Sequence, residues 1–311
     1  MGGDCGGRRK KRMSKKTALL VTIAILLLAA GLLYWKSRHA APRIAPRPGN
    51  AVAPAPAANP ERKAGNAQPG TPAAVPAMAS SAKKGAPAGA AFTLRAGETL
   101  EYAANVTKLN STIANLQLVT AERRNFYGQN SWHLQAFAHT ENPYRMVFAL
   151  DDQFDSYSAA SDLASLQYEM HLNERGEKVD LVQRMVSSSK EAAPADASAA
   201  RVPAGTRDPL GLLQYLRGVD WSKTPAIKSA VYDGRKFYEA HAALVGQGAA
   251  VQVPAGKYTA SKIEIRVYEN GTEMKDAHFL LYLSADAARL PVLLEAVLPV
   301  ATARVELNNA K

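Results

Sequence analysis

Histidines are the first side chains of this sequence that could do chemistry. His133 and His139 stand six residues apart in or beside one expected strand, and this even spacing puts both side chains on the same face. Two histidines on one face could begin a metal site, but no carboxylate or third ligand follows at a telling spacing. Three other histidines stand singly in expected strands and are interpreted as ordinary strand residues: His171, His241 and His278. We therefore expect no metal site.

An acidic cluster is the second candidate. Asp151, Asp152 and Asp155 could act as paired carboxylates or hold a hard cation. The plainer interpretation is a solvated strand end, because the spacing of a calcium-binding loop is absent. The sequence also contains no Gly-x-Ser-x-Gly nucleophile motif and no phosphate-binding glycine loop of the known types. The sequence therefore predicts no catalytic, cofactor-binding or metal-ligating residue, and no cofactor.

The chain has a single cysteine, Cys5. It therefore has no intramolecular disulfide and no cysteine-based zinc site. A bacterial lipoprotein would carry its cysteine directly after the apolar stretch, whereas Cys5 lies before it. We expect an unmodified thiol, with acylation near the membrane as the alternative.

The aromatic residues of the body are expected to fill its core or line a barrel. They would form a ligand-binding wall only if the barrel were not filled by its own side chains. The residues are Tyr102, Phe126, Tyr127, Trp132, Phe148, Tyr157, Trp221, Phe237, Tyr258 and Phe279.

The net charge of +11 is unevenly distributed. Residues 1–91 carry 15 Lys/Arg and 2 Asp/Glu, whereas residues 92–311 carry 23 Lys/Arg and 25 Asp/Glu. A nucleic-acid-binding domain needs a basic face on its folded part. Because the basic excess lies outside the body, we expect no nucleic-acid partner.

One stretch, Thr17–Trp35, contains nineteen residues without a charge, enough to span a bilayer as a helix. Seven basic residues precede it between positions 8 and 16, and only Lys36 and Arg38 follow closely. This asymmetry predicts a single-pass anchor in the bacterial inner membrane, with residues 1–16 cytoplasmic and the body periplasmic. The alternative is a cleaved signal peptide, but Arg38 stands where a small residue would be needed.

Residues 36–91 are rich in Ala, Pro and Gly and hold ten of the eighteen prolines. So few large apolar side chains cannot offset the entropy of ordering, which predicts a disordered linker. The linker is either a bare spacer or a segment whose Lys and Arg touch anionic lipid or cell-wall polymer.

Residues 92–311 form the body, which reads as short β-forming runs separated by polar breaks. Ile263, Ile265 and Val267 alternate with charged residues, a pattern typical of a strand with one buried face. Twelve strands are expected, over residues 99–107, 112–120, 131–138, 145–150, 166–172, 178–186, 229–232, 236–245, 258–268, 274–284, 290–297 and 301–307.

Turn and helix signals complete the prediction. Hairpin turns are expected at 173–176, and Asp233-Gly234 and Asn270-Gly271 match type I′ turns. A polar loop is expected at 187–205. One helix should begin after Asp208 and end at Gly218, with leucines at positions 210, 213 and 216 on one face. The fold class is therefore all-β: a single, mostly antiparallel sheet, curved or closed into a barrel of about 12 strands, with one short helix.

Five stretches of the body, taken in order, resemble the bacterial envelope family catalogued as domain of unknown function 3108. The likeness covers about residues 92–308. It implies an exported protein with a β-rich domain, and it transfers no active site, since none is established for the family. The stretches are FTLRAGETLEY (92–102), DPLGLLQYLR (208–217), VYDGRKFY (231–238), VPAGKY (253–258) and LSADAARLPV (283–292).

Two functional hypotheses follow. The first is a membrane-anchored envelope protein without enzymatic activity, which binds a lipid, a glycan or a partner protein. The second is an envelope hydrolase with an unrecognised site. The lack of a nucleophile motif or a set of metal ligands favours the first.

Overall fold

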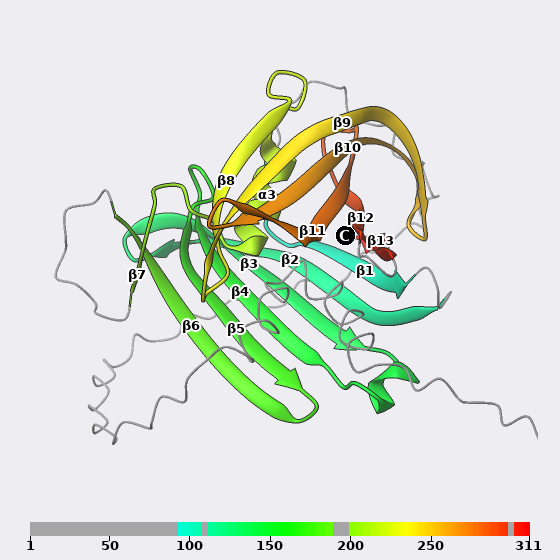
Figure 1. The fold of residues 1–311 in the computed structure, drawn as a ribbon, viewed down its shortest axis with the longest axis horizontal. Helices are drawn as coiled ribbons and strands as arrows, with labels where there is room; N and C mark the ends of the chain where they lie inside the picture. Colours follow the sequence, from blue (N-terminus) through cyan, green and yellow to red (C-terminus); the bar gives the residue numbers. More distant parts are fainter. Residues whose placement is uncertain (1–92, 107–110, 189–198, 298–301) are drawn as a thin grey trace, which may run out of the picture.

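The computed structural model describes residues 93–106, 111–188, 199–297 and 302–311 (Figure 1). The expected cytoplasmic tail (1–16), membrane helix (17–35) and linker (36–91) lie outside these residues. Within the described part, no helix has the length and hydropathy needed to cross a membrane.

The described residues form one sheet of thirteen strands, one α-helix, α3 (Pro209–Gly218), and one short 3₁₀ helix, η1 (Tyr144–Met146). The first seven strands are β1 (Glu98–Val106), β2 (Thr112–Phe126), β3 (Gln129–Thr140), β4 (Asp151–Ala159), β5 (Ser165–Glu174), β6 (Glu177–Ser187) and β7 (Ala200–Val202). The other six are β8 (Ala226–Tyr232), β9 (Phe237–Val253), β10 (Gly256–Glu269), β11 (Thr272–Ser284), β12 (Pro291–Val297) and β13 (Thr302–Ala310).

The strand order is β7-β6-β5-β4-β3-β2-β1-β13-β12-β11-β10-β9-β8. Two meanders therefore meet where the first strand, β1, pairs antiparallel with the last, β13. The middle of the chain supplies both edges of the sheet, β7 and β8, and α3 connects them. All pairings between neighbouring strands are antiparallel except β6–β7. The prediction of an all-β, mostly antiparallel curved sheet with one short helix is confirmed, with thirteen strands in place of about twelve.

The two edges of the sheet come close enough to make it a nearly closed barrel (Figure 1). The segment after β7 makes the contact, because Arg207 forms a parallel bridge with Val231 of β8. The Arg207 amide donates to the Ala230 carbonyl at 3.0 Å, and the Tyr232 amide donates to the Arg207 carbonyl at 2.9 Å. On the other side, the Ser165 amide donates to the Thr206 carbonyl at 2.9 Å. Residues 206 and 207 thus join β5 to β8 through backbone hydrogen bonds.

Alternation along the strands places the core on the concave face. In β1, every second residue from Glu98 to Val106 is buried and the residues between them are half-buried. The same alternation in β10 buries Ile263 and Ile265, as the sequence predicts. The buried apolar side chains form one continuous cluster that includes both meanders and α3.

Helix α3 begins and ends as the sequence predicts. Asp208 is the N-cap and Pro209 the first helical residue, and the three leucines expected on one face are buried. The helix packs closely on the sheet, since a Cβ at Gly211 would lie 2.9 Å from the Ser158 hydroxyl of β4.

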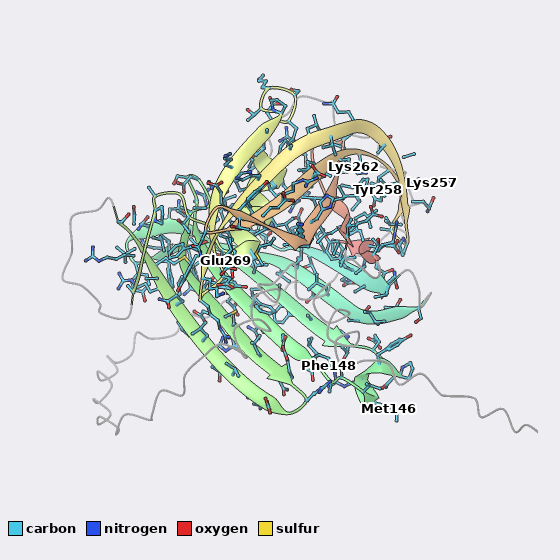
Figure 2. All side chains as sticks on the ribbon, in the orientation of Figure 1. Met146, Phe148, Lys257, Tyr258, Lys262 and Glu269 are labelled. Carbon is cyan, nitrogen blue, oxygen red and sulfur yellow. The ribbon has the colours of Figure 1, made fainter. Side chains whose placement is uncertain are left out.

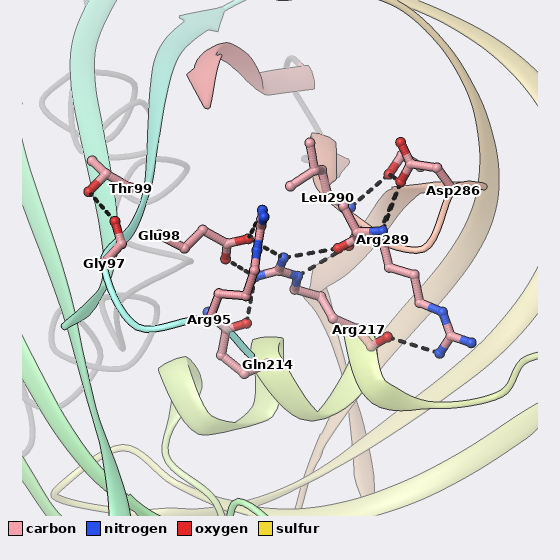
Figure 3. A network of polar contacts seen from close by, with 11 residues as sticks. Arg95, Gly97, Glu98, Thr99, Gln214, Arg217, Asp286, Arg289 and Leu290 are labelled. Carbon is pink, nitrogen blue, oxygen red and sulfur yellow. Dashed lines mark hydrogen bonds and ion pairs between the residues drawn. The ribbon is translucent and has the colours of Figure 1, made fainter. Parts of the chain in front are cut away.

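A buried ion pair ties α3 to both meanders (Figure 3). The Arg217 guanidinium donates to both carboxylate oxygens of Glu98 in β1, at 2.6 and 3.0 Å. It also donates to the backbone carbonyls of Ala288 and Arg289, both at 3.1 Å, in the β11–β12 turn. Arg217 is 1 % exposed and is among the largest fully buried side chains. The helix is therefore attached at its C-terminal end to strands from the two ends of the body.

Several predicted elements differ in the structure, and β2, for example, ends at Phe126 rather than at residue 120. Residues 145–150 are not a strand: η1 occupies this region, and Met146 is exposed at the end of the sheet (Figure 2). The strand in this part of the chain is β4, which begins directly after the predicted one. The sequence did not predict it, because Asp is uncommon in strands. Strand β9 continues to Val253 rather than ending near residue 245, and β7 lies inside the expected loop 187–205.

Of the expected turns, Asn270-Gly271 is confirmed as a two-residue connection with φ of 51° and 76°. The β5–β6 hairpin also turns where expected, through Arg175 and Gly176. The type I′ prediction at Asp233-Gly234 is wrong, because β8 ends at Tyr232 and β9 begins at Phe237. The Asp233 carboxylate closes this longer loop by accepting from the amides of residues 235 and 236.

Candidate functional site

A hollow with a volume of about 420 Å³ lies beside α3. Its walls come from the segment before β1, from β2, β3 and β8, from the β4–β5 turn, and from α3 with the loop that follows it. Its volume lies in the range of sites that hold small molecules. We call it the α3 hollow, and its lining includes Arg123, Trp132, Asp162, Gln214, Tyr215 and Asp220.

The α3 hollow carries charges of both signs beside aromatic rings. The Arg123 guanidinium lies 5.3 Å from the centre of the Trp132 ring, a cation–π distance. Asp220 accepts hydrogen bonds from the Ser222 hydroxyl and amide and pairs with Lys223, and these contacts lower its pKa to about 2. The hollow is therefore lined by a cation, a carboxylate that is ionised at neutral pH and aromatic side chains.

Arg207 fixes three walls of the hollow relative to one another. Its guanidinium lies 3.6 Å from the centre of the Tyr215 ring on α3. It donates to the Asp162 carbonyl in the β4–β5 turn at 2.7 Å and to the Ser229 hydroxyl of β8 at 3.1 Å. Because a planar guanidinium can stack and donate sideways at once, one side chain holds the helix, the turn and the sheet edge.

The two histidines considered as a metal pair, His133 and His139, do not meet. His133 hydrogen-bonds Asp155 at 2.7 Å and stacks on Tyr157, with ring centres 4.6 Å apart. His139 pairs with Glu141 at 3.1 Å.

The other three histidines each have an acidic neighbour within hydrogen-bond distance. His171 bonds Asp180 at 2.7 Å and His278 bonds Glu264 at 2.8 Å, while His241 makes a short contact with Glu239.

The three aspartates do not form a cluster. Strand alternation places Asp152 on the concave face of β4 and Asp151 and Asp155 on the convex face. Asp151 is the first residue of β4 and is exposed, so the expectation of a solvated strand end is confirmed for this residue. Asp151 forms an exposed two-pronged ion pair with Arg145, at 2.8 and 2.5 Å. Asp152 and Asp155 are buried, so the expectation of a solvated group is wrong for these two.

The expected burial of the aromatic residues is confirmed in part. Tyr102, Trp132, Trp221 and Phe279 are buried. Tyr127 and Phe237 are 55 % and 43 % exposed, because each lies at a hairpin end where the sheet no longer covers it. Phe126, Phe148, Tyr157 and Tyr258 are half-buried.

Asp152 is an ionisable residue in a buried position. One carboxylate oxygen accepts from the Asn173 amide at 2.8 Å, and the other has no hydrogen-bond partner among the described residues. Burial is the main cause that raises the pKa of Asp152 to about 7. The folded protein therefore holds a proton on Asp152 at pH values where the unfolded chain has lost it.

We expect Asp152→Asn to weaken the pH dependence of stability. Between pH 4 and 7 the unfolded chain is ionised at this position and the folded one is not, so stability falls as pH rises. From pH 5 to pH 8 the wild type should lose about 2 kcal/mol more than Asp152→Asn. Urea unfolding of both proteins at the two pH values measures this difference. Equal losses in the two proteins would show that Asp152 titrates normally.

Of the residues that line the α3 hollow, the sequence predicted a place in the core or in a ligand-binding wall only for Trp132. Arg123, Asp162 and Tyr215 belong to segments about 40 and 50 positions apart, and no local pattern connects them. The one usable signal is the capped helix beginning at Asp208, which places Tyr215 on an ordered element.

The model of a family described as "Protein of unknown function (DUF3108)" matches residues 101–308. No curated protein matches the sequence.

Three of the solved structures that match this chain are the following. A β-barrel-like protein of domain of unknown function DUF1849 from Brucella abortus is 10 % identical, covers 70 % of this chain and 97 % of its own, and has a TM-score of 0.44. A candidate lipoprotein of Parabacteroides distasonis is 11 % identical, with coverages of 71 % and 97 % and a TM-score of 0.33. A candidate exported protein of Bacteroides fragilis is 12 % identical, with coverages of 71 % and 98 % and a TM-score of 0.33.

Proposed function

This chain belongs to the DUF3108 family of proteins of unknown function, and we propose that it is a membrane-tethered, non-enzymatic binding protein of the bacterial envelope. Its ligand is a glycan held in the α3 hollow. The observation that carries the proposal is the lining of this hollow, where Trp132 and Tyr215 stand beside the charged groups of Arg123, Asp162 and Asp220.

The proposed attachment to the membrane is inferred from the sequence of residues 1–91. Residues 17–35 are long and apolar enough to span the inner membrane, and the basic residues before them favour a cytoplasmic amino terminus. The 56 residues from 36 to 91 would extend to at most about 170 Å as polyproline-like chain. The body can thus reach ligands well away from the membrane on the periplasmic side.

A glycan suits the hollow better than a lipid or a protein. A sugar ring has an apolar face that packs on aromatic side chains, and hydroxyl groups that bond carboxylate oxygens and guanidinium groups. An acyl chain would leave Arg123, Asp162 and Asp220 facing hydrocarbon, which costs free energy. A stable protein partner needs a broad contact surface of about 1,200–2,000 Å² in total. The α3 hollow is instead a concave site of a size that holds a small molecule. Arg123 further favours a glycan that carries a carboxylate.

The test is a titration of the full-length protein in detergent micelles. The probe is a disaccharide of N-acetylated amino sugars that carries one carboxylate. Isothermal titration calorimetry measures its binding. We expect saturable binding that Arg123→Gln and Asp220→Asn each weaken at least about tenfold, as loss of a charged hydrogen bond does.

Arg124→Gln is the matched control, because Arg124 follows Arg123 on β2 and lies over Tyr157 on the other face. Equal weakening by Arg123→Gln and Arg124→Gln would contradict the assignment of the site. Failure of the wild type to bind the disaccharide, together with co-purified phospholipid seen by native mass spectrometry, would favour the lipid alternative.

The hydrolase alternative has one supporting observation, the buried Asp152, whose pKa of about 7 is typical of general acids and bases. It predicts turnover of an ester, glycosidic or peptide substrate that is lost on replacing Asp151, Asp152 or His133. Assays of the same purified protein with a panel of such substrates decide between the two functions.

A further inference from the structure

Three side chains that could bind a metal ion meet on the convex face of β4 and β5. Asp155 of β4 stands directly opposite Glu169 of β5, and His171 follows Glu169 by two residues on the same face. One ligand atom from each residue lies within 4.8 Å of the others. This set is separate from the α3 hollow and shares no residue with its lining.

The register of β4 and β5 places two carboxylates against each other. Like charges directly opposite on neighbouring strands repel and destabilise a sheet. The neighbours that donate to these carboxylates are mostly neutral amides: Gln135 and Gln153 to Asp155, each at 2.8 Å, and Gln167 to Glu169 at 2.5 Å. A bound cation between Asp155 and Glu169 would turn this repulsion into attraction.

His171 is oriented as a metal-binding imidazole is. Its Nδ1 lies 2.7 Å from the Asp180 carboxylate of β6, and its Nε2 lies 3.5 Å from the Glu169 carboxylate. An imidazole that donates one ring N–H to a carboxylate presents the lone pair of the other nitrogen to a metal ion. The ring is thus turned so that Nε2 faces the two carboxylates.

The carboxylate of Asp155 is also held in place. His133 bonds one oxygen at 2.7 Å together with Gln135, and Gln153 bonds the other. Ligands fixed by neighbours on a rigid sheet lose little entropy when an ion binds. The side chains of Asp155, Glu169 and His171 are 6 %, 18 % and 38 % exposed, so the set is open to solvent on the His171 side.

We propose that Asp155, Glu169 and His171 form a binding site for a divalent transition-metal ion, with zinc as the best match. One imidazole and two carboxylates are ligands that zinc accepts, and three protein ligands leave a coordination position for water. Asp180 and His133 act as positioning residues behind His171 and Asp155.

The experiment measures zinc binding by the full-length protein in detergent micelles after removal of metal with a chelator. A chromophoric chelator competes for added ZnCl₂, and Co²⁺ in place of zinc gives a visible ligand-field absorption band that reports coordination. We expect one saturable site, weakened at least about 100-fold by His171→Gln and about tenfold by the positioning variant Asp180→Asn.

His278→Gln is the matched control, since His278 also bonds a carboxylate, that of Glu264, but belongs to no group of three possible metal ligands among the described residues. It should bind zinc as the wild type does. Glu169→Gln, which keeps the shape of the side chain, gives a second loss variant if His171→Gln fails to fold. Absence of saturable binding in the wild type, or equal affinities of His171→Gln and His278→Gln, would overturn the proposal. Neither outcome depends on glycan binding.

Discussion

Arg217→Met is expected to lower the free energy of unfolding by about 3–5 kcal/mol, because it removes one partner of a buried ion pair. The Glu98 carboxylate would stay buried, without the two hydrogen bonds that it receives at 2.6 and 3.0 Å. The carbonyls of Ala288 and Arg289 would also lose the donors that tie the β11–β12 turn to α3 (Figure 3). Urea unfolding followed by tryptophan fluorescence measures the loss, since Trp221 packs beside this helix end.

Arg145→Met is the matched control. Arg145 makes an equally well-formed pair with Asp151, but both side chains are about 40 % exposed. Water replaces such a contact, so the control should lose far less stability. The double variant Glu98→Met/Arg217→Met should lose less than Arg217→Met alone, because no buried charge is then left unpaired. Similar losses for Arg217→Met and Arg145→Met would show that the buried pair does not hold the helix.

Asp208→Ala should be the second most damaging change, with an expected loss of about 3 kcal/mol. One carboxylate oxygen caps α3 by accepting from the amides of Leu210 and Gly211, both at 2.9 Å. The other accepts from the hydroxyls of Ser156 at 2.6 Å and of Ser165. Asp208 is fully buried, so alanine would remove the acceptor of two amides and two hydroxyls inside the protein. Of these donors, the Ser156 hydroxyl also lies 2.8 Å from the Ser158 hydroxyl.

Two further variants separate the cap from the rest of the network. Asp208→Asn keeps an oxygen for the two helix amides and should lose about 2 kcal/mol, since the hydroxyls of Ser156 and Ser165 both lose their acceptor. Asp220→Ala removes an exposed carboxylate that also accepts from the backbone two residues later, and should change stability little. Urea unfolding of Asp208→Ala, Asp208→Asn and Asp220→Ala measures how much free energy of unfolding each variant loses. If Asp208→Ala and Asp220→Ala behaved alike, the buried cap would not contribute to stability.

Local chemistry made α3 predictable. Asp208 accepts from free helix amides, Pro209 is tolerated in the first turn, and the leucine spacing of three residues gives one apolar face. Asn270-Gly271 was predictable for the same reason, because both residues tolerate positive φ. Each signal lies within a few residues of the element that it determines.

Strand β4 was not predictable, because its identity depends on neighbours distant in sequence. Asp151, Asp152 and Asp155 read as a polar break, and intrinsic strand preference argues against them. In the folded protein each carboxyl group is accommodated differently. Asp151 pairs with an arginine, Asp152 is buried and keeps its proton, and Asp155 accepts hydrogen bonds from amide and imidazole groups. Pairing with β3 and β5 outweighs the local preference.

The candidate sites depend on the same long-range contacts. His171 was interpreted as an ordinary strand residue, since its relation to Asp155 follows from the register of β4 and β5 and not from spacing. A shift of that register by one residue would carry Glu169 and His171 to the concave face. The α3 hollow likewise exists only once α3 lies against the sheet.

By itself, the sequence determined the all-β class of the body, the position and caps of α3, and the absence of familiar catalytic motifs. These follow from periodicity and from residues that act on their immediate neighbours. Its expectations for residues 1–91 remain predictions. Only the tertiary structure decided that β7 and β8 approach through Arg207, and that Asp152 faces inward while Asp155 faces Glu169. Alternation tells which residues share a face of a strand, but packing against distant strands decides which face is buried and what lies opposite.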